Sequence, residues 1–310
     1  MNTGGDRNRS AAPPLFAASP TPPLVETPSG KGAADENFPV GSFLLPARLR
    51  PHVTTFYAFA RAIDDIADNP DLAAGDKIAR LDGFEQAVLG NMDDPAYAKA
   101  VAMHASLQET GITPAHCQDL VSAFKQDAVK RRYDDWDDLV DYCLRSAAPV
   151  GRYLLDLHGE STKAYPHSDA LCIALQVINH LQDCKDDFLT LDRVYLPGDW
   201  MRAEDVHAGA LAADAASAGL LRVIRLGARA ADQLLAGARA LSFELDSKRL
   251  AMESAVIIRI AEKLTALLMR EDPVAKRVEL DRLRFAQCGI SGLLDVLLAR
   301  GGRERSGKPS

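Results

Sequence analysis

The stretch Phe56-Tyr-Ala-Phe-Ala-Arg-Ala-Ile-Asp-Asp-Ile-Ala-Asp68 places two aspartates, Asp64 and Asp68, four residues apart in an otherwise apolar segment. Residues at i and i+4 lie on the same face of an α-helix, so both carboxylates would project from one ridge. If these carboxylates are buried they need a partner, because an isolated buried charge costs more free energy than the helix can recover. The apolar residues that predict burial of this segment are Phe56, Phe59, Ile63 and Ile66.

A second segment, Gln176-Val-Ile-Asn-His-Leu-Gln-Asp-Cys-Lys-Asp-Asp187, repeats the same step at Asn179, Asp183 and Asp187. Two such helices facing each other would surround divalent cations with oxygen ligands. Mg2+ takes one or two carboxylates and keeps water or phosphate oxygens as well, so four or five acids imply two or three ions sharing a diphosphate. These ions would neutralise the leaving group and let a carbon–oxygen bond ionise without a protein nucleophile. The pattern therefore predicts allylic diphosphate chemistry between apolar walls.

A simpler interpretation of the first segment is a solvated helix surface, since charged side chains are mostly exposed. Arg61 lies one turn before Asp64, and a surface ion pair between them would contribute only ~0.3 kcal/mol. The second acidic ladder, on another apolar helix, is hard to explain in this way. The two segments together favour a binding site.

The composition excludes several classes of protein. The 310 residues are 47% hydrophobic and 25% charged, as in soluble globular proteins, and the net charge of -7 argues against a nucleic-acid partner. No apolar run approaches the roughly 20 residues that cross a bilayer, and the first residues lack the layout of a signal peptide. We therefore expect a cytoplasmic protein with no obligate protein partner. Its five cysteines form no Cys-x-x-Cys pair and are expected to be reduced: Cys117, Cys143, Cys172, Cys184 and Cys288.

Helical periodicity recurs along the chain, and no segment shows the alternation typical of a strand. We predict one all-α domain over residues 35–299, between a disordered segment 1–34, rich in Pro and small residues, and a flexible tail 300–310. The predicted helices cover about 51–69, 76–89, 95–109, 114–129, 136–157, 167–189, 203–211, 215–243, 249–269 and 281–298.

Over nearly all of residues 35–298 the chain resembles the squalene/phytoene synthase family of head-to-head isoprenoid synthases. The resemblance implies a helical bundle around a central cavity. The motifs that carry it are Tyr57-x-x-x-Arg61-x-x-Asp64-Asp65-x-x-Asp68, Tyr142-Cys143-x-x-Ser146-Ala147-x-Pro149-Val150-Gly151, Gln176-x-x-Asn179-x-x-x-Asp183-x-x-x-Asp187 and Arg193-Val-Tyr-Leu-Pro197, with Arg277-Val278 as a looser match.

The resemblance also implies roles for individual residues. Tyr142 would face the reacting carbons, where a phenol stabilises a cation or hydrogen-bonds the departing phosphate; a core aromatic is the alternative. The implied Mg2+ ligands are Asp64, Asp68, Asn179, Asp183 and Asp187. The resemblance also implies that these four aspartates are catalytic. The implied contacts to the prenyl diphosphate substrate are Asn37, Tyr57, Arg61, Gln176 and Arg277.

Two departures from the family pattern make the site less cationic. The flap that commonly reads Ser-x-Ser-Phe is Asp35-Glu-Asn37-Phe38 here, and Gln182 replaces an arginine. Both differences argue against binding two farnesyl diphosphates. The sequence most resembles the bacterial hopanoid-pathway branch, which ionises presqualene diphosphate and captures the rearranged cation with water to give hydroxysqualene. No Gly-x-Gly-x-x-Gly motif indicates a nicotinamide cofactor, although that absence is weak evidence.

Other functions remain open at this stage. Presqualene diphosphate synthase, squalene synthase and phytoene synthase share these motifs, and a chain-elongating prenyl diphosphate synthase also uses Asp-Asp-x-x-Asp helices. From a different class, a non-catalytic helical scaffold or lipid-binding protein could keep the fold. The apolar residues of 283–298 indicate core packing, with a peripheral membrane contact as the alternative.

Overall fold

The computed structural model describes residues 25–26 and 45–306, with side chains as far as 298. The α-helices are α1 (Arg50–Asp68), α2 (Ala74–Val88), α3 (Ala98–Thr110), α4 (Ala115–Asp127), α5 (Trp136–Ser146), α6 (Ala148–His158), α7 (Tyr165–Gln182), α8 (Cys184–Leu191), α9 (Gly198–Ala203), α10 (Ala218–Ala238), α11 (Leu241–Glu244), α12 (Lys248–Leu268) and α13 (Arg282–Ser306). Three short 3-10 helices are η1 (Pro95–Tyr97), η2 (Thr162–Ala164) and η3 (Ala208–Ala212).

Helix α1 forms where the opening stretch predicts it. Pro51 occupies the first turn, where its missing N–H has no intrahelical partner to lose. The helix ends at Asp68, just before Pro70, because proline disfavours helical conformation in the residue that precedes it. All four apolar residues named for this segment are buried, which gives α1 the core-facing stripe of an amphipathic helix.

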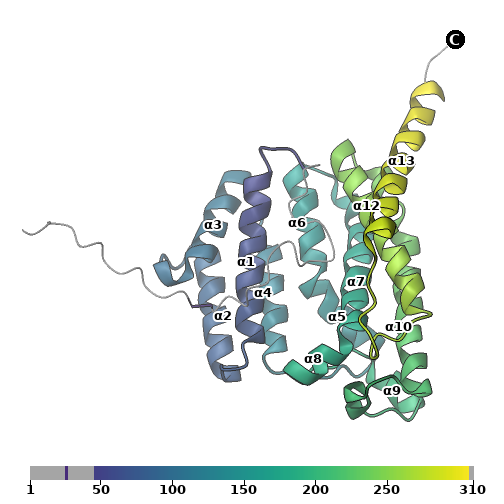
Figure 1. Cartoon of the computed structure of the whole chain (residues 1–310). Coiled ribbons are helices and arrows are strands. Elements are labelled where there is room, and N and C mark those ends of the chain that lie inside the picture. The colour runs from purple at the N-terminus through teal and green to yellow at the C-terminus, as the bar shows by residue number, and fades with distance from the viewer. Residues whose placement is uncertain (1–24, 27–44, 307–310) are drawn as a thin grey trace, which may run out of the picture.

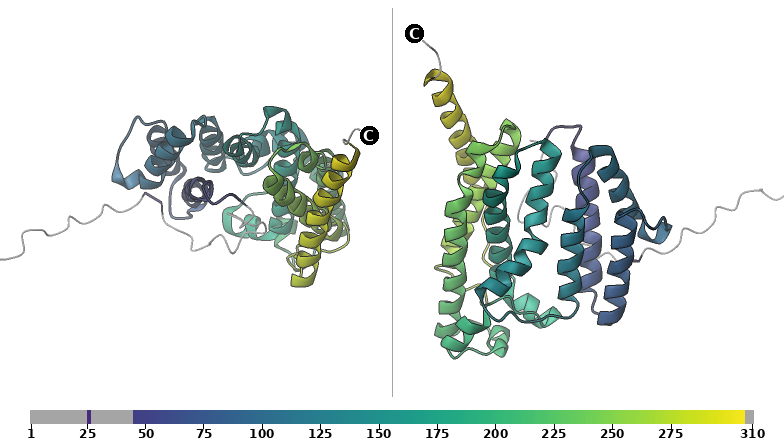
Figure 2. Two further views of the ribbon diagram at one scale, coloured as in Figure 1. Left: turned by 90° about the horizontal axis from the view of Figure 1, so that it is seen from above. Right: turned by 180° about the vertical axis from the view of Figure 1, so that it is seen from behind.

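The helices form two groups joined through the middle of the molecule. Helix α1 packs against α2, α3 and α4, whereas α7 packs against α5, α6, α10 and α12. Figure 1 shows α1 and α7 both running toward the end of the molecule where α8 and α9 lie, and Figure 2 shows the same arrangement from above and behind. The first acidic segment occupies the last turns of α1, and the second runs from the last turns of α7 into α8. This topology brings both segments to one end of the bundle.

Three of the expected helices are each divided into two α-helices, and the expected helix 215–243 divides after Ala238, between α10 and α11. The expected helix 136–157 breaks at Ala147, which has φ −124° and ψ −46°, and α6 restarts with Pro149 in its first turn. A proline inside a helix loses one hydrogen bond and clashes with the carbonyl four residues earlier, so the break follows from that residue. The expected helix 167–189 divides at Asp183, between α7 and α8.

The prediction of a helix over residues 203–211 is wrong. Helix α9 ends at Ala203 and the chain then turns into η3. Asp205 has φ 53°, in the left-handed region, so a right-handed helix cannot continue through it. The composition of this segment did not reveal that break.

The all-α prediction is confirmed for the described residues, in which the bridge between Arg132 and Val194 is the one β-type pairing. All five cysteines are free, as expected. None of the described helices combines the length and apolar character that crossing a membrane requires. Within the segment expected to be disordered, Val25 and Glu26 are described, and Glu26 is buried with Lys99 3.0 Å from its carboxylate. The rest of residues 1–34 and residues 307–310 lie outside the described residues.

Candidate active site

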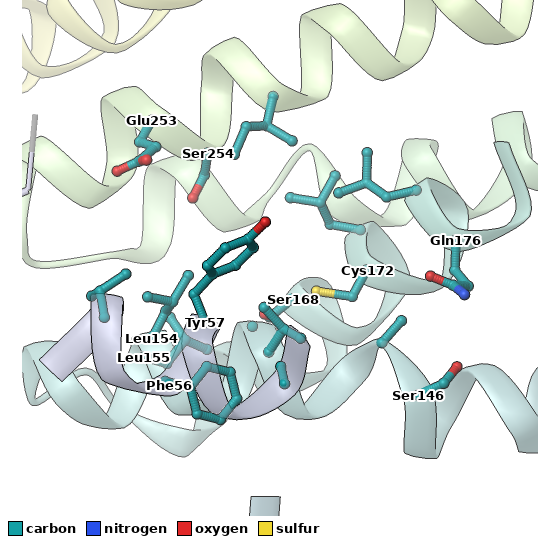
Figure 3. Close-up of a pocket in the computed structure, with 18 of the residues that line it drawn as sticks. Phe56, Tyr57, Ser146, Leu154, Leu155, Ser168, Cys172, Gln176, Glu253 and Ser254 are labelled. Carbon is teal, nitrogen blue, oxygen red and sulfur yellow. The ribbon is translucent and has the colours of Figure 1, made fainter. Parts of the chain in front are cut away.

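A cavity of about 370 Å³ lies between α1, α6, α7 and α12 (Figure 3). This volume falls within the roughly 300–1,000 Å³ typical of small-molecule sites. Most of the wall is apolar and suits a hydrocarbon. The apolar side chains lining it include Leu45, Val53, Phe56, Phe124, Leu154, Leu155, Leu171, Leu175, Leu241, Leu250 and Ile257.

Five of the residues expected in the site line this one cavity. Tyr57, Arg61 and Asp64 reach it from α1, and Gln176 and Asn179 reach it from α7. Their spacings of three or four residues place each set on one face of its helix. The two segments are more than one hundred residues apart in sequence, yet they meet across a hollow with polar groups on both sides.

The first acidic segment is held by an arginine from its own helix. Arg61 lies 2.8 Å from Asp64 and 3.1 Å from Asp65, and the Asp65 side chain is almost fully buried. Burial, and then the neighbouring Asp68, raise the pKa of Asp64 well above its ordinary value. A nearby cation would stabilise the ionised form of Asp64, because added positive charge offsets both effects.

Asp68 is connected to a distant part of the chain. Arg193, which follows α8, places one guanidinium nitrogen 2.5 Å from Oδ1 of Asp68 and donates from the other to the carbonyl of Ala67 at 3.0 Å. Arg193 is buried, so its ion pair is better shielded from water than a surface pair. The sequence matched Arg193 to a motif but did not indicate which residue it contacts.

The second acidic segment continues through a change of helix direction. Asp183 joins α7 to α8, yet its N–H donates to the Asn179 carbonyl at 2.9 Å and its own carbonyl accepts from the Asp187 N–H at 2.8 Å. The i to i−4 pattern therefore survives, which keeps the ladder in register. His180 lies 3.8 Å from the Asp187 carboxylate.

Arg277, which the motif match assigned to the diphosphate, forms an ion pair with Asp183. Its guanidinium contacts both carboxylate oxygens, at 2.7 and 3.1 Å. Burial raises the pKa of Asp183, and Arg277 opposes that effect.

Gln182, which replaces an arginine of the family, is buried and donates to the carbonyl of Val278 at 2.5 Å. This hydrogen bond ties the Arg277 segment to the end of α7 and so helps to place the guanidinium beside Asp183.

Tyr142 lies within a buried polar network. Its hydroxyl donates to Asp127 at 2.6 Å, and the hydroxyl of Tyr195 donates to the other oxygen of Asp127 at 3.2 Å. Burial raises the pKa of Asp127 to about 6 and also raises the pKa of Tyr142. The ring of Tyr142 packs beside those of Tyr133 and His180. The structure thus directs the Tyr142 hydroxyl to Asp127, a partner that the sequence did not indicate because the two residues lie on separate helices.

The acidic side chains supply ligands suited to Mg2+, which prefers hard oxygen donors. Within the described residues, no three His, Cys, Asp or Glu side chains stand close enough together to hold a metal ion by themselves. Mg2+ commonly uses one or two carboxylates and completes its shell with water and substrate phosphates, so paired carboxylates fit it. The raised pKa of Asp64 is a further sign that this end of the cavity accommodates positive charge. Asn37 lies outside the described residues.

The structure reveals one acidic residue of the cavity that the sequence did not single out. Glu253 on α12 lines the wall beside Ser254 and is only 6% exposed. The sequence offered a faint signal, namely a carboxylate between apolar residues of a helix, but no partner motif for it.

Burial raises the pKa of Glu253 from 4.5 to about 7. Because the folded-state value is the higher one, the stabilising contribution is complete below about pH 4.5 and is lost as the pH rises to about 7. Between pH 5 and pH 8 the wild type should therefore lose about 2.5 kcal/mol of unfolding free energy relative to Glu253→Gln. Urea denaturation at both pH values measures this difference. Parallel pH profiles for the two proteins would contradict it, and Glu262→Gln, outside the cavity on the same helix, is the control.

Known proteins resemble this chain over most of its length. A family model described as squalene/phytoene synthase matches residues 32–284. The hydroxysqualene synthase of Sinorhizobium fredii is 41% identical over 86% of this chain and 90% of its own length. That of Zymomonas mobilis is 44% identical over 81% of this chain and 84% of its own. The crystal structure of squalene synthase HpnC from Alicyclobacillus acidocaldarius aligns with a TM-score of 0.65 and 33% identity, over 74% of this chain and 87% of that one.

Proposed function

The chain belongs to the squalene/phytoene synthase family, and from this premise we propose that it converts presqualene diphosphate and water into hydroxysqualene and diphosphate. The observation that supports this best is the cavity itself. Arg61 and Asp64 meet Gln176 and Asn179 around it, while most of the remaining wall is apolar. One end therefore suits a diphosphate and its counterions, and the rest suits a hydrocarbon chain. The named relatives at 41% and 44% identity support the same reaction.

Mg2+ is the metal that these ligands fit. Asp64 and Asp68 would hold it from α1, and Asn179, Asp183 and Asp187 from the second segment. When bound, it supplies positive charge that neutralises the departing diphosphate. Arg193 and Arg277 form ion pairs with Asp68 and Asp183, so these arginines would keep the carboxylates oriented.

The chain's own residues supply binding, orientation and protection from water. Arg61 is positioned to clamp a diphosphate oxygen, since a guanidinium offers several donors in fixed geometry. Tyr57 and Gln176 also line the cavity. Tyr57 lies about two helical turns before Asp64, and Gln176 lies about one turn before Asn179. The apolar wall excludes bulk water, which protects the carbocation until its rearrangement is complete. The Tyr142 hydroxyl donates to Asp127 and would hold that carboxyl group in place.

The purified protein, incubated with Mg2+ and presqualene diphosphate in the absence of NADPH, is expected to release diphosphate and form hydroxysqualene. Chelation with EDTA should abolish both, because the carboxylates alone cannot neutralise the leaving group. Mass spectrometry of the organic phase and a diphosphate assay measure the two products. A parallel incubation with farnesyl diphosphate is the control. Formation of presqualene diphosphate or squalene from farnesyl diphosphate would replace the proposed reaction by that of another branch of the family.

A further inference from the structure

Glu253 is an acidic group on the apolar part of the cavity wall. It lies in the second turn of α12, and in Figure 3 it is on the opposite side of the view from Gln176. Its side chain is buried, and its Oε2 atom accepts no hydrogen bond from the residues that the structure describes. A buried carboxyl oxygen without a hydrogen-bond partner is costly, so its presence in an apolar wall requires an explanation.

A purely structural role would pair Glu253 with a basic side chain or a backbone N–H. Burial is the sole cause of its raised pKa, so no charged side chain of the described chain compensates it. Four hydroxyl groups line the cavity, those of Tyr57, Ser146, Ser168 and Ser254. Two of them lie on the side of Glu253: Ser254 follows it on α12, and Tyr57 projects from α1 toward the same side (Figure 3). Together these residues offer an acceptor and two groups that both donate and accept, which suits one small polar molecule.

We propose that Glu253, with Ser254 and Tyr57, holds the water molecule that captures the carbocation, and that its carboxylate accepts the proton which this water loses. The inference rests on the proposed function and assigns one of its steps to residues outside the two acidic motifs. Tyr57 precedes Arg61 by one helical turn, about 6 Å along the axis, so the held water lies beyond the ionising end. Water kept at that distance meets the rearranged cation rather than the carbon that carried the diphosphate.

The step balances in atoms and charge. The diphosphate has left with the electron pair of its carbon–oxygen bond, leaving a C30 cation. The water oxygen gives an electron pair to the cationic carbon and forms the new carbon–oxygen bond. One O–H bond of that water breaks, and its proton goes to the Glu253 carboxylate. The products are a neutral alcohol and a carboxylic acid, which returns its proton to solvent when the cavity opens for product release.

The test compares Glu253→Gln and Glu253→Leu with the wild type in Mg2+ and presqualene diphosphate. Glutamine keeps the shape and the hydrogen-bonding capacity of the side chain but cannot take up a proton. Leucine can neither form hydrogen bonds nor take up a proton. Each variant is expected to form at least about tenfold less hydroxysqualene per diphosphate released, because a positioned base contributes about 10²–10⁴-fold to proton transfer. The uncaptured cation should lose a proton to solvent or diphosphate and give C30 polyenes. Glu253→Asp should restore part of the alcohol, and Glu262→Gln is the matched control.

The ratio of alcohol to diphosphate is the decisive measurement, since a change in folding alone would lower both together. An unchanged ratio in Glu253→Gln, beside a wild type that makes hydroxysqualene, would overturn this inference alone. Folded variants that release no diphosphate would also overturn it, because Glu253 would then act before water capture. A wild type that releases no diphosphate or makes no alcohol would overturn the proposed function and this inference together.

Discussion

Asp64→Asn and Asp183→Asn are each expected to lower the rate of diphosphate release from presqualene diphosphate by about 10²–10³-fold or more, with an unchanged helical circular-dichroism signal. Asn keeps the size of the side chain but removes the negative charge that a cation requires. Burial, and then the charge of Asp68, raise the pKa of Asp64, so replacing its carboxylate by a neutral amide should not harm folding. Asp183 is half-buried and already compensated by Arg277. Both losses should therefore appear in turnover.

The matched control for these variants is Asp186→Asn. Asp186 is exposed on α8, one position away from Asp187 and outside the acidic ladder. Its substitution should leave diphosphate release within about twofold of the wild type, since isolated surface changes have small effects. Full activity in Asp64→Asn or Asp183→Asn would mean that the metal ligands are misassigned, whereas equal losses in all three variants would point to a general effect of charge.

Arg193→Met is expected to lower the free energy of unfolding by about 3 kcal/mol or more. Removing one partner of a buried ion pair leaves an uncompensated charge, which typically costs about 3–5 kcal/mol. Asp68 is partly exposed, so the lower end of that range applies. Two further interactions are lost, the hydrogen bond to the Ala67 carbonyl and the electrostatic compensation of Asp127. Urea denaturation at pH 7 measures the change.

A similar arginine in the same region provides the comparison for Arg193→Met. Arg132 pairs with Asp192, and both side chains are largely exposed. Arg132→Met should therefore cost less than about 1 kcal/mol, as surface salt bridges do. Equal losses in the two variants would show that burial does not strengthen the Arg193 interaction, and that the segment after α8 contributes little to holding the end of α1.

The helices carrying the acidic motifs could be predicted from the sequence because helical periodicity is a local property. Phe56 and Ile63 recur on one face of α1, Pro51 begins the helix, and their burial follows. The divisions at Ala147 and Asp183 were missed, although Pro149 was a local signal for the first of them. At Asp183 the hydrogen-bond spacing is kept while the dihedral angles change, so periodicity alone could not reveal it.

The site residues that the sequence identified are those with regular spacing on one helix. Arg61 and Asp64 on α1, and Gln176 and Asn179 on α7, all line the cavity. Residues that act through a distant partner gave no comparable signal. Asp127 is one example, because its contact with Tyr142 depends on how α4 packs against α5.

The sequence by itself determined that the chain is helical, that two acidic ladders lie on apolar helices, and which family it belongs to, since each of these depends on residues a few positions apart. The tertiary structure alone decided that the first residue of each ladder, Asp64 or Asn179, lines the same cavity. It also decided that Arg193 and Arg277 pair with Asp68 and Asp183, and that Glu253 lies in the apolar wall. The physical reason is the separation in sequence over which each interaction acts. Hydrogen bonding and side-chain periodicity act within a helix, whereas burial and ion pairing depend on how separate helices pack.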